Sequence, residues 1–184
     1  MGRGLRRQPA RPEIAEPVNL FSLVSLLTLV SSAAPAWQPI ELEVIGRINY
    51  ARARGFDCAK QTYSAKPLAA LVPHPKLRAA ARGHALDMQV RGYFAHDTPD
   101  GVTVKDRVRQ TGYVAARASE NILGGQRLGS SARSAVKWWL ASPVHCRNIM
   151  NPLYTQIGAG HVFEPSDAAG LQHYWVIVFA APQP

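Results

Sequence analysis

The sequence predicts an α+β fold: a three-layer α-β-α sandwich in which a small, mostly antiparallel sheet lies between helices. Helical patterns of apolar residues recur from residue 39 to residue 142, and the last third of the chain changes to strand-like patterns. The final strand pattern, HYWVIVF at 173–179, is apolar at nearly every position. A strand without alternation is covered on both faces, so we expect helices above and below the sheet.

Four helices are expected before the last strands. In each, apolar residues recur three and four positions apart with polar residues between them. Each also has a start or stop signal: a proline in the first turn, a serine cap, or a glycine shortly after the end. The expected helices are 39–54, 75–91, 104–110 and the segment between a cap at Ser130 or Ser131 and Pro143.

Two strands are expected near the C-terminus, at 154–162 and 173–179, because both segments are rich in aromatic and β-branched residues. The segment EPSDAAG between them reads as the long loop of a β-hairpin. A further strand is expected near 93–95 or around Ile122.

The first 36 residues are predicted to be a secretory signal peptide and not part of the fold. Arginines precede an apolar run at 20–30, and Ala34-Pro35-Ala36 follows as an A-x-A cleavage site. The run is about half the length that a membrane span needs. Residues 37–184 should then form a single domain, without a transmembrane segment, that is secreted or periplasmic. We also expect a monomer.

Charge and cysteine content limit the classes of function that the protein can have. The chain carries 21 Lys and Arg against 12 Asp and Glu, a net charge of +9, which attracts anions of many kinds. Export, the even scatter of charge and the lack of a recognition motif argue against nucleic acid. In an oxidising compartment Cys58 and Cys146 are expected to form a disulfide, worth about 4 to 5 kcal/mol. A catalytic Cys146 beside His145 is the alternative.

Four strings follow one another along the chain: GYFAHDTPDG, ASENILGG, WWLASPVHCRNIMNPLYTQIGAG and HYWVIVF. Together they resemble the ordered motifs of the CAP superfamily, which includes cysteine-rich secretory proteins, insect-venom antigens and plant pathogenesis-related proteins. The resemblance covers about residues 40–182 and is closest to the small bacterial secreted branch. It implies an α-β-α sandwich, in agreement with the prediction from the residues.

The candidate site residues are His96, Glu120 and His145, which lie on three separate segments near turn-forming residues. Two imidazoles and a carboxylate can bind a divalent cation, zinc or magnesium, or can form a hydrogen-bonded structural cluster. The resemblance implies a central cleft with two His and two Glu, in which these residues take three positions and Ser142 the fourth. Asn121 can orient the Glu120 carboxylate or cap the turn.

The positions of three other histidines can be explained by structural roles alone. His84 lies mid-helix on an apolar face, where we expect a hydrogen-bonded core histidine. His161 and His173 lie on facing strands of the predicted hairpin, so a cross-strand pair or an exposed rim explains them.

The resemblance favours a binding module for a lipid-like small molecule or for cell-wall material, with a divalent cation at the cleft as one option. The alternative is a metal-assisted hydrolase of the protease-like kind, acting in the periplasm or outside the cell. Ser119 and Ser142 lie near the candidate residues in sequence, but neither is part of a recognised nucleophile motif. We therefore expect binding rather than catalysis.

Overall fold

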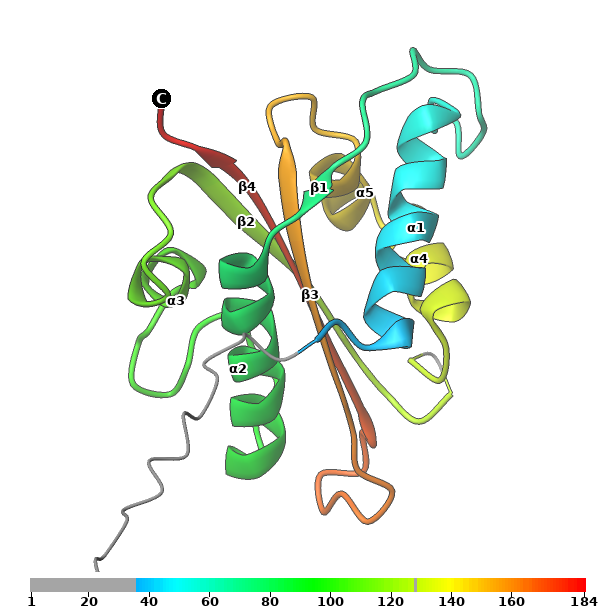
Figure 1. The fold of residues 1–184 in the computed structure, drawn as a ribbon. Coiled ribbons are helices and arrows are strands. Elements are labelled where there is room, and N and C mark those ends of the chain that lie inside the picture. Colours follow the sequence, from blue (N-terminus) through cyan, green and yellow to red (C-terminus); the bar gives the residue numbers. More distant parts are fainter. Residues whose placement is uncertain (1–35, 128) are drawn as a thin grey trace, which may run out of the picture. The chain divides into compact units, whose positions relative to one another are not determined.

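A four-stranded sheet lies between two layers of helices in the computed structural model, which describes residues 36–127 and 129–184 (Figure 1). The strand order is β1-β3-β4-β2. Strand β1 pairs in parallel with β3, whereas β4 pairs antiparallel with both β3 and β2. The strands are β1 (Val72–Pro73), β2 (Ala115–Gly124), β3 (Gln156–Phe163) and β4 (His173–Pro182). The predicted α-β-α sandwich with a mostly antiparallel sheet is confirmed.

Each face of the sheet is covered by its own group of helices. One face packs against α1 (Pro39–Ala53), α4 (Ala132–Ala141) and α5 (Pro143–Ile149). The other packs against α2 (Pro75–Arg91) and α3 (Val104–Gln110). Alternate residues of β4 enter the two cores: Trp175, Ile177 and Phe179 on the first face, and Tyr174, Val176, Val178 and Ala180 on the second. This is why the β4 sequence shows no polar alternation.

Two elements, α5 and β1, were not predicted, and the place of the further strand, which the sequence left open, is now defined. Pro143 ends α4, as expected, but it also opens α5, because a proline fits the first turn of a helix as well as it stops the preceding one. The further strand lies around Ile122, as β2, and residues 93–95 are not a strand. The two-residue strand β1 was not predicted. The proposed signal peptide, residues 1–36, lies outside the described residues except for Ala36.

Helix α2 approaches β3 closely because β3 carries two glycines on that side. A Cβ atom placed on Gly158 would lie 2.1 Å from the carbonyl carbon of Leu77, and one on Gly160 would lie 2.5 Å from that of Ala81. Both contacts are with helix backbone, which cannot rotate aside as a side chain can. The alternation Gly-Ala-Gly therefore sets the distance between this layer and the sheet.

Two long-range ties hold α5 to the N-terminal part of the domain. The predicted disulfide between Cys58 and Cys146 is present and spans 88 positions. The guanidinium of Arg52, in α1, is buried and donates hydrogen bonds to the backbone carbonyls of Ile149 (2.8 Å), the last residue of α5, and of Asn151 (2.9 Å), just beyond it. Among the residues described, no helix is long and apolar enough to cross a membrane.

Candidate functional site

Glu120 lies on β2, one of the two edge strands of the sheet, and its side chain is only 1% exposed. Its Oε1 atom accepts a hydrogen bond from His96 Nδ1 at 3.0 Å. Its Oε2 atom accepts one from Arg107 Nη2 at 2.7 Å. The carboxylate is thus held between a half-exposed imidazole, 55% exposed, and a buried guanidinium that balances its charge.

His84 is a third side chain near this carboxylate. It is fully buried in α2, its Nε2 atom donates to the carbonyl of Ala95 at 3.0 Å, and the same atom lies 3.8 Å from Glu120 Oε1. Burial lowers the pKa of His84, so the neutral imidazole is favoured. It is the hydrogen-bonded core histidine expected from the sequence, and it also packs beside the site.

His145 lies at the start of α5, close to the end of α4. Its Nδ1 atom is 2.8 Å from the hydroxyl oxygen of Ser142, and its ring centroid is 5.1 Å from that of Trp138. Ser142 thus interacts with an imidazole at the position where the family resemblance implies a carboxylate. The hydrogen bond and the indole together limit how the His145 ring can turn.

Asn121 holds the α5 backbone and makes no hydrogen bond to the Glu120 carboxylate. Its side-chain amide donates to the carbonyl of His145 at 3.0 Å, and its Oδ1 atom accepts from Asn148 at 2.8 Å. Neighbouring residues of a strand point to opposite faces, so Asn121 faces α5 while Glu120 faces α2 and α3. The expectation that Asn121 orients the carboxylate or caps a turn is therefore wrong. It positions the helix that carries His145.

The two site histidines have opposite pKa shifts. The hydrogen bond with Glu120 raises the pKa of His96, which favours its imidazolium form. Burial, and next the positive charge of His96, lower the pKa of His145 and favour its neutral form. The charge of His96 thus contributes to the pKa shift of His145, although the two residues lie on different segments.

The sequence prediction counted Glu120 among three metal ligands. Both of its oxygens are instead occupied, one by His96 and one by Arg107. Across residues 36–127 and 129–184, no three His, Cys, Asp or Glu side chains are grouped as metal ligands. Glu120 has the position of a group that orients His96 from behind, which is a common role for a carboxylate next to a ligating imidazole.

Arg107 is the site residue that the sequence reasoning missed. It lies on the short helix α3, one position before the buried Val108, so helical spacing could have placed it on or near the buried face. Nothing in the local pattern indicates that its partner is Glu120, because that ion pair forms only when α3 packs on β2.

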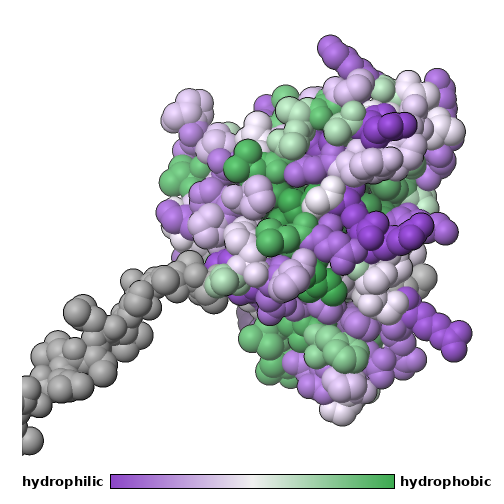
Figure 2. Space-filling model, turned by 45° about the vertical axis from the view of Figure 1, so that its right-hand side comes forward, coloured by the Kyte–Doolittle hydropathy of each residue, from purple (hydrophilic) through white to green (hydrophobic). Residues whose placement is uncertain are grey.

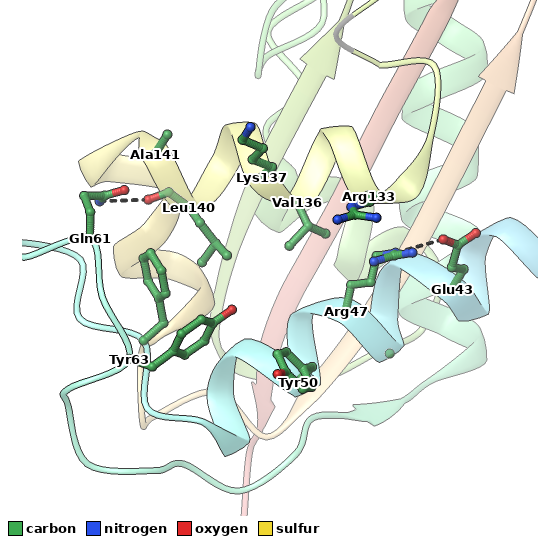
Figure 3. Close-up of a pocket in the computed structure, with 12 residues that line it drawn as sticks. Glu43, Arg47, Tyr50, Gln61, Tyr63, Arg133, Val136, Lys137, Leu140 and Ala141 are labelled. Atoms are coloured by element: carbon green, nitrogen blue, oxygen red, sulfur yellow. Dashed lines mark hydrogen bonds and ion pairs between the residues drawn. The ribbon is translucent and has the colours of Figure 1, made fainter.

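A second feature is a groove between α1, α4 and the segment 56–63, with a volume of about 930 Å³. Figure 3 shows its side chains converging from these three segments. We call it the α1–α4 groove. Its apolar walls are Tyr50, Phe56, Tyr63, Val136 and Leu140. In Figure 2, where the side of the molecule that carries α1 and α4 comes forward, hydrophobic side chains lie between hydrophilic ones.

The rim of the α1–α4 groove is charged. Glu43 and Arg47 form an ion pair at 2.8 Å along α1. Arg133 and Lys137, on α4, have no ion-pair partner among the described residues. Gln61 closes one end, where its amide donates to the Leu140 carbonyl at 3.0 Å. The sequence reasoning did not find this groove, because its walls come from segments about 80 residues apart.

His161 and His173 lie apart from both features and form the expected cross-strand pair. Their Nε2 and Nδ1 atoms are 3.0 Å apart. Burial, and next the neighbouring His173, lower the pKa of His161 to about 4. Burial also lowers the pKa of His173. The pair is thus neutral at neutral pH.

Comparison with known proteins gives one family. The model of the Cysteine-rich secretory protein family, CAP, matches residues 45–179. The Bacillus subtilis protein YkwD is 36% identical over 86 residues, which are 47% of this chain and 32% of that protein. This chain thus spans about a third of that relative's length.

Two solved structures share the fold. An extracellular protein containing an SCP domain, from Bacillus anthracis str. Ames, has a TM-score of 0.61 and 24% identity, covering 79% of this chain and 44% of that one. An outer surface protein from Borrelia burgdorferi has a TM-score of 0.60 and 18% identity, covering 76% of this chain and 90% of that one. At these identities the likeness shows the fold alone.

Proposed function

The chain belongs to the cysteine-rich secretory protein family, and from that premise we propose that it is an exported binding module that holds an anionic lipid in the α1–α4 groove. The observation that carries this proposal is the combination of apolar walls and cationic rim in one groove of about 930 Å³. That volume lies near the upper end of the range for small-molecule sites.

The walls supply the affinity for an acyl chain. Tyr63 packs edge-on against Tyr50 and Phe56, with ring centroids 6.0 and 5.2 Å apart, so one wall is a continuous aromatic surface. Val136 and Leu140 face it from α4. Each methylene group that such walls bury contributes about 0.8 kcal/mol. A chain of six methylenes would therefore gain about 5 kcal/mol before the entropy of ordering it is subtracted.

The rim supplies the preference for a negative head group. Because Glu43 is paired with Arg47, the side chains of Arg133 and Lys137 are left to meet an incoming anion. A fatty-acid carboxylate or a lipid phosphate satisfies both conditions, since its charge stays at the rim while its tail enters the groove. A neutral glycan of the cell wall would use neither the apolar walls nor these charges fully.

Export is supported by the predicted signal peptide at 1–36 and by the disulfide, which persists in oxidising compartments. The structural relatives are described as extracellular and as an outer surface protein. We accordingly assign the protein to the periplasm or the extracellular space. A reducing cytosol would leave Cys58 and Cys146 as thiols.

A divalent cation at His96 and His145 is a second part of the proposal. His145 is held in its neutral, ligating form, and His96 is oriented by a carboxylate behind it. Two imidazoles suit zinc better than magnesium, which prefers oxygen ligands. When bound, the cation would supply a Lewis acid at this edge of the sheet, beside Ser142. A metal-assisted hydrolase is the competing function.

The test fills the groove without disturbing the fold. Gly46 lines the groove on α1, and a Cβ placed there meets no atom within 4 Å. Gly46→Leu should therefore occupy the groove while favouring the helix. Calorimetric titration with palmitate should show binding to the parent protein and at least about a tenfold weaker binding to Gly46→Leu, which corresponds to about 1.4 kcal/mol.

The matched control is Gly83→Leu, a second helical glycine with open space, which lies on α2 and outside the groove. It should bind palmitate like the parent. Lys137→Gln should weaken palmitate binding but leave the binding of the uncharged alcohol hexadecanol unchanged. If Gly46→Leu binds palmitate as tightly as the parent, the groove is not the lipid site. Zinc-dependent hydrolysis of an ester or peptide substrate, abolished in His145→Ala, would favour the hydrolase instead.

A further inference from the structure

A separate hollow lies beside α3 and the first half of β2, two elements that Figure 1 labels. Its volume is about 520 Å³, and it shares no lining residue with the α1–α4 groove. We call it the α3–β2 hollow. Its lining on the strand side includes three small residues, Ala115, Ala116 and Ala118, whose side chains cover little of the strand backbone.

The outer edge of β2 can be identified from its pairing with β4. The backbone of Gly125, directly after β2, donates to the carbonyl of His173 on β4, so the odd-numbered residues of β2 form hydrogen bonds with β4. This register holds along β2 after the irregularity at Ala116. The backbone N–H and C=O groups of the even-numbered residues from 118 to 122 therefore point away from β4.

Ala118 is the open position on this outer edge. The two later carbonyls are occupied: that of Glu120 accepts from the Asn148 side chain at 3.3 Å, and that of Ile122 accepts from the Trp139 indole at 3.0 Å. Ala118 is half-buried and lines the hollow, and no other described residue bonds to its backbone on this side. A strand that adds beside Ala118 can thus form two backbone hydrogen bonds with it.

The hollow is also cationic. Lys105 and Arg109 lie four positions apart on α3, Arg117 lies on β2, and all three are exposed lining residues. Within the described part of the chain, Lys105 and Arg117 have no ion-pair partner, and the lining contains no Asp or Glu. Arg109 is paired at 2.8 Å with Asp106, which lies outside the lining. A positive charge therefore remains to attract an anion.

These charges lie on both sides of the open edge. Neighbouring residues of a strand face opposite sides of the sheet, so Arg117 faces away from the side of Ala118, which packs in the core below α2 and α3. Lys105 and Arg109 belong to the α3 side. An added strand alternates in the same way, so its successive side chains would meet cations on each side. A second copy that paired through its own β2 would bring like charges together, which is unfavourable.

From these observations we propose that the α3–β2 hollow docks an extended acidic peptide segment of another protein. The segment adds as a short strand beside Ala118 and places its carboxylates next to Lys105, Arg109 and Arg117. Backbone pairing supplies a fixed register, and the charge-assisted contacts select acidic side chains.

The experiment is fluorescence anisotropy on the whole protein at low ionic strength, where exposed charges are least screened. The probe is a labelled, capped hexapeptide of sequence VEEVEE. It should bind with a submillimolar Kd, and the uncharged peptide VQQVQQ should bind at least about tenfold more weakly. VEEVEE methylated at its central backbone nitrogens keeps every carboxylate but loses the amide donors, and it should also bind at least about tenfold more weakly.

Two variants test the place of binding. Lys105→Gln combined with Arg109→Gln should weaken VEEVEE binding at least about tenfold, whereas Lys60→Gln combined with Lys66→Gln removes the same charge outside the hollow and should leave it unchanged. Ala118→Pro removes an N–H that no strand of the sheet uses, so it should fold and bind VEEVEE at least about tenfold more weakly. If it does not fold, the methylated peptide supplies the same test.

The proposal is overturned if VEEVEE does not bind at millimolar concentration or if the doubly neutralised α3 variant binds it as the parent does. It is also overturned if the methylated peptide binds as tightly as VEEVEE, because the hollow would then attract any polyanion and not a strand. Gly46→Leu, which fills the α1–α4 groove, should leave peptide binding unchanged, so this proposal and the lipid proposal can fail independently.

Discussion

Replacing Gly158 with alanine should push helix α2 away from the sheet. The added Cβ would lie 2.1 Å from the carbonyl carbon of Leu77, 2.4 Å from its oxygen and 2.3 Å from the backbone nitrogen of Arg78. Carbon atoms pack at about 3.5 to 4.0 Å, so the two backbones must separate by more than about 1 Å. Overpacking costs about 1 to 3 kcal/mol when side chains can adjust. Here only backbone can move, so we expect at least about 3 kcal/mol.

The assay is thermal and urea unfolding of the purified domain. For a domain of this size a loss of about 3 kcal/mol lowers Tm by about 6 to 12 °C. Gly160→Ala should behave similarly, since its Cβ would meet the backbone of Ala81. Gly83→Ala is the control: it adds the same methyl group to α2 in open space and should stabilise by up to about 1 kcal/mol. A Gly158→Ala protein as stable as the parent would refute the reasoning.

Three further predictions concern the disulfide, pH and the site carboxylate. Cys58→Ala should cost about 4 kcal/mol in urea unfolding, and adding Cys146→Ala should cost less than a second such amount because the bridge is already lost; free thiols in the native protein would contradict this. Between pH 6.5 and about 4 the unfolded state binds a proton at His161 that the folded state does not bind, because the pKa of the half-buried His161 is lowered to about 4. The free energy of unfolding should therefore fall as pH is lowered, by up to about 3 kcal/mol from this residue. His161→Gln should flatten that decline, and an identical pH profile would count against the pKa assignment. Glu120→Gln leaves Arg107 buried without its counter-charge and should destabilise by about 3 kcal/mol, whereas exposed Glu43→Gln should change little; equal stabilities of the two variants would show that the buried ion pair contributes nothing.

The layered fold could be predicted because its signals are local. An uninterrupted apolar strand at 173–179 requires cover on both faces, and the helical patterns on either side of β2 supply it. Strand β1 could not be predicted, because a two-residue strand is defined by its pairing with β3 and has no pattern of its own. A proline at position 143 is compatible with the end of a helix and with the start of another. The packing of Cys146 and Ile149 in the core favours a second helix, α5, after it.

For the site, the sequence by itself determined residue types and approximate places, and tertiary structure decided the partners. His96 and Glu120 were named together with His145 as candidate site residues, and the structure gives His96 and Glu120 a direct hydrogen bond. The ion pair of Glu120 with Arg107 could not be predicted from the sequence, because it depends on the distance between the two side chains in space. That distance becomes short only when α3 and β2 pack on the same core. The α1–α4 groove has the same origin: its two helices are distant in sequence, and only their packing leaves a space between them.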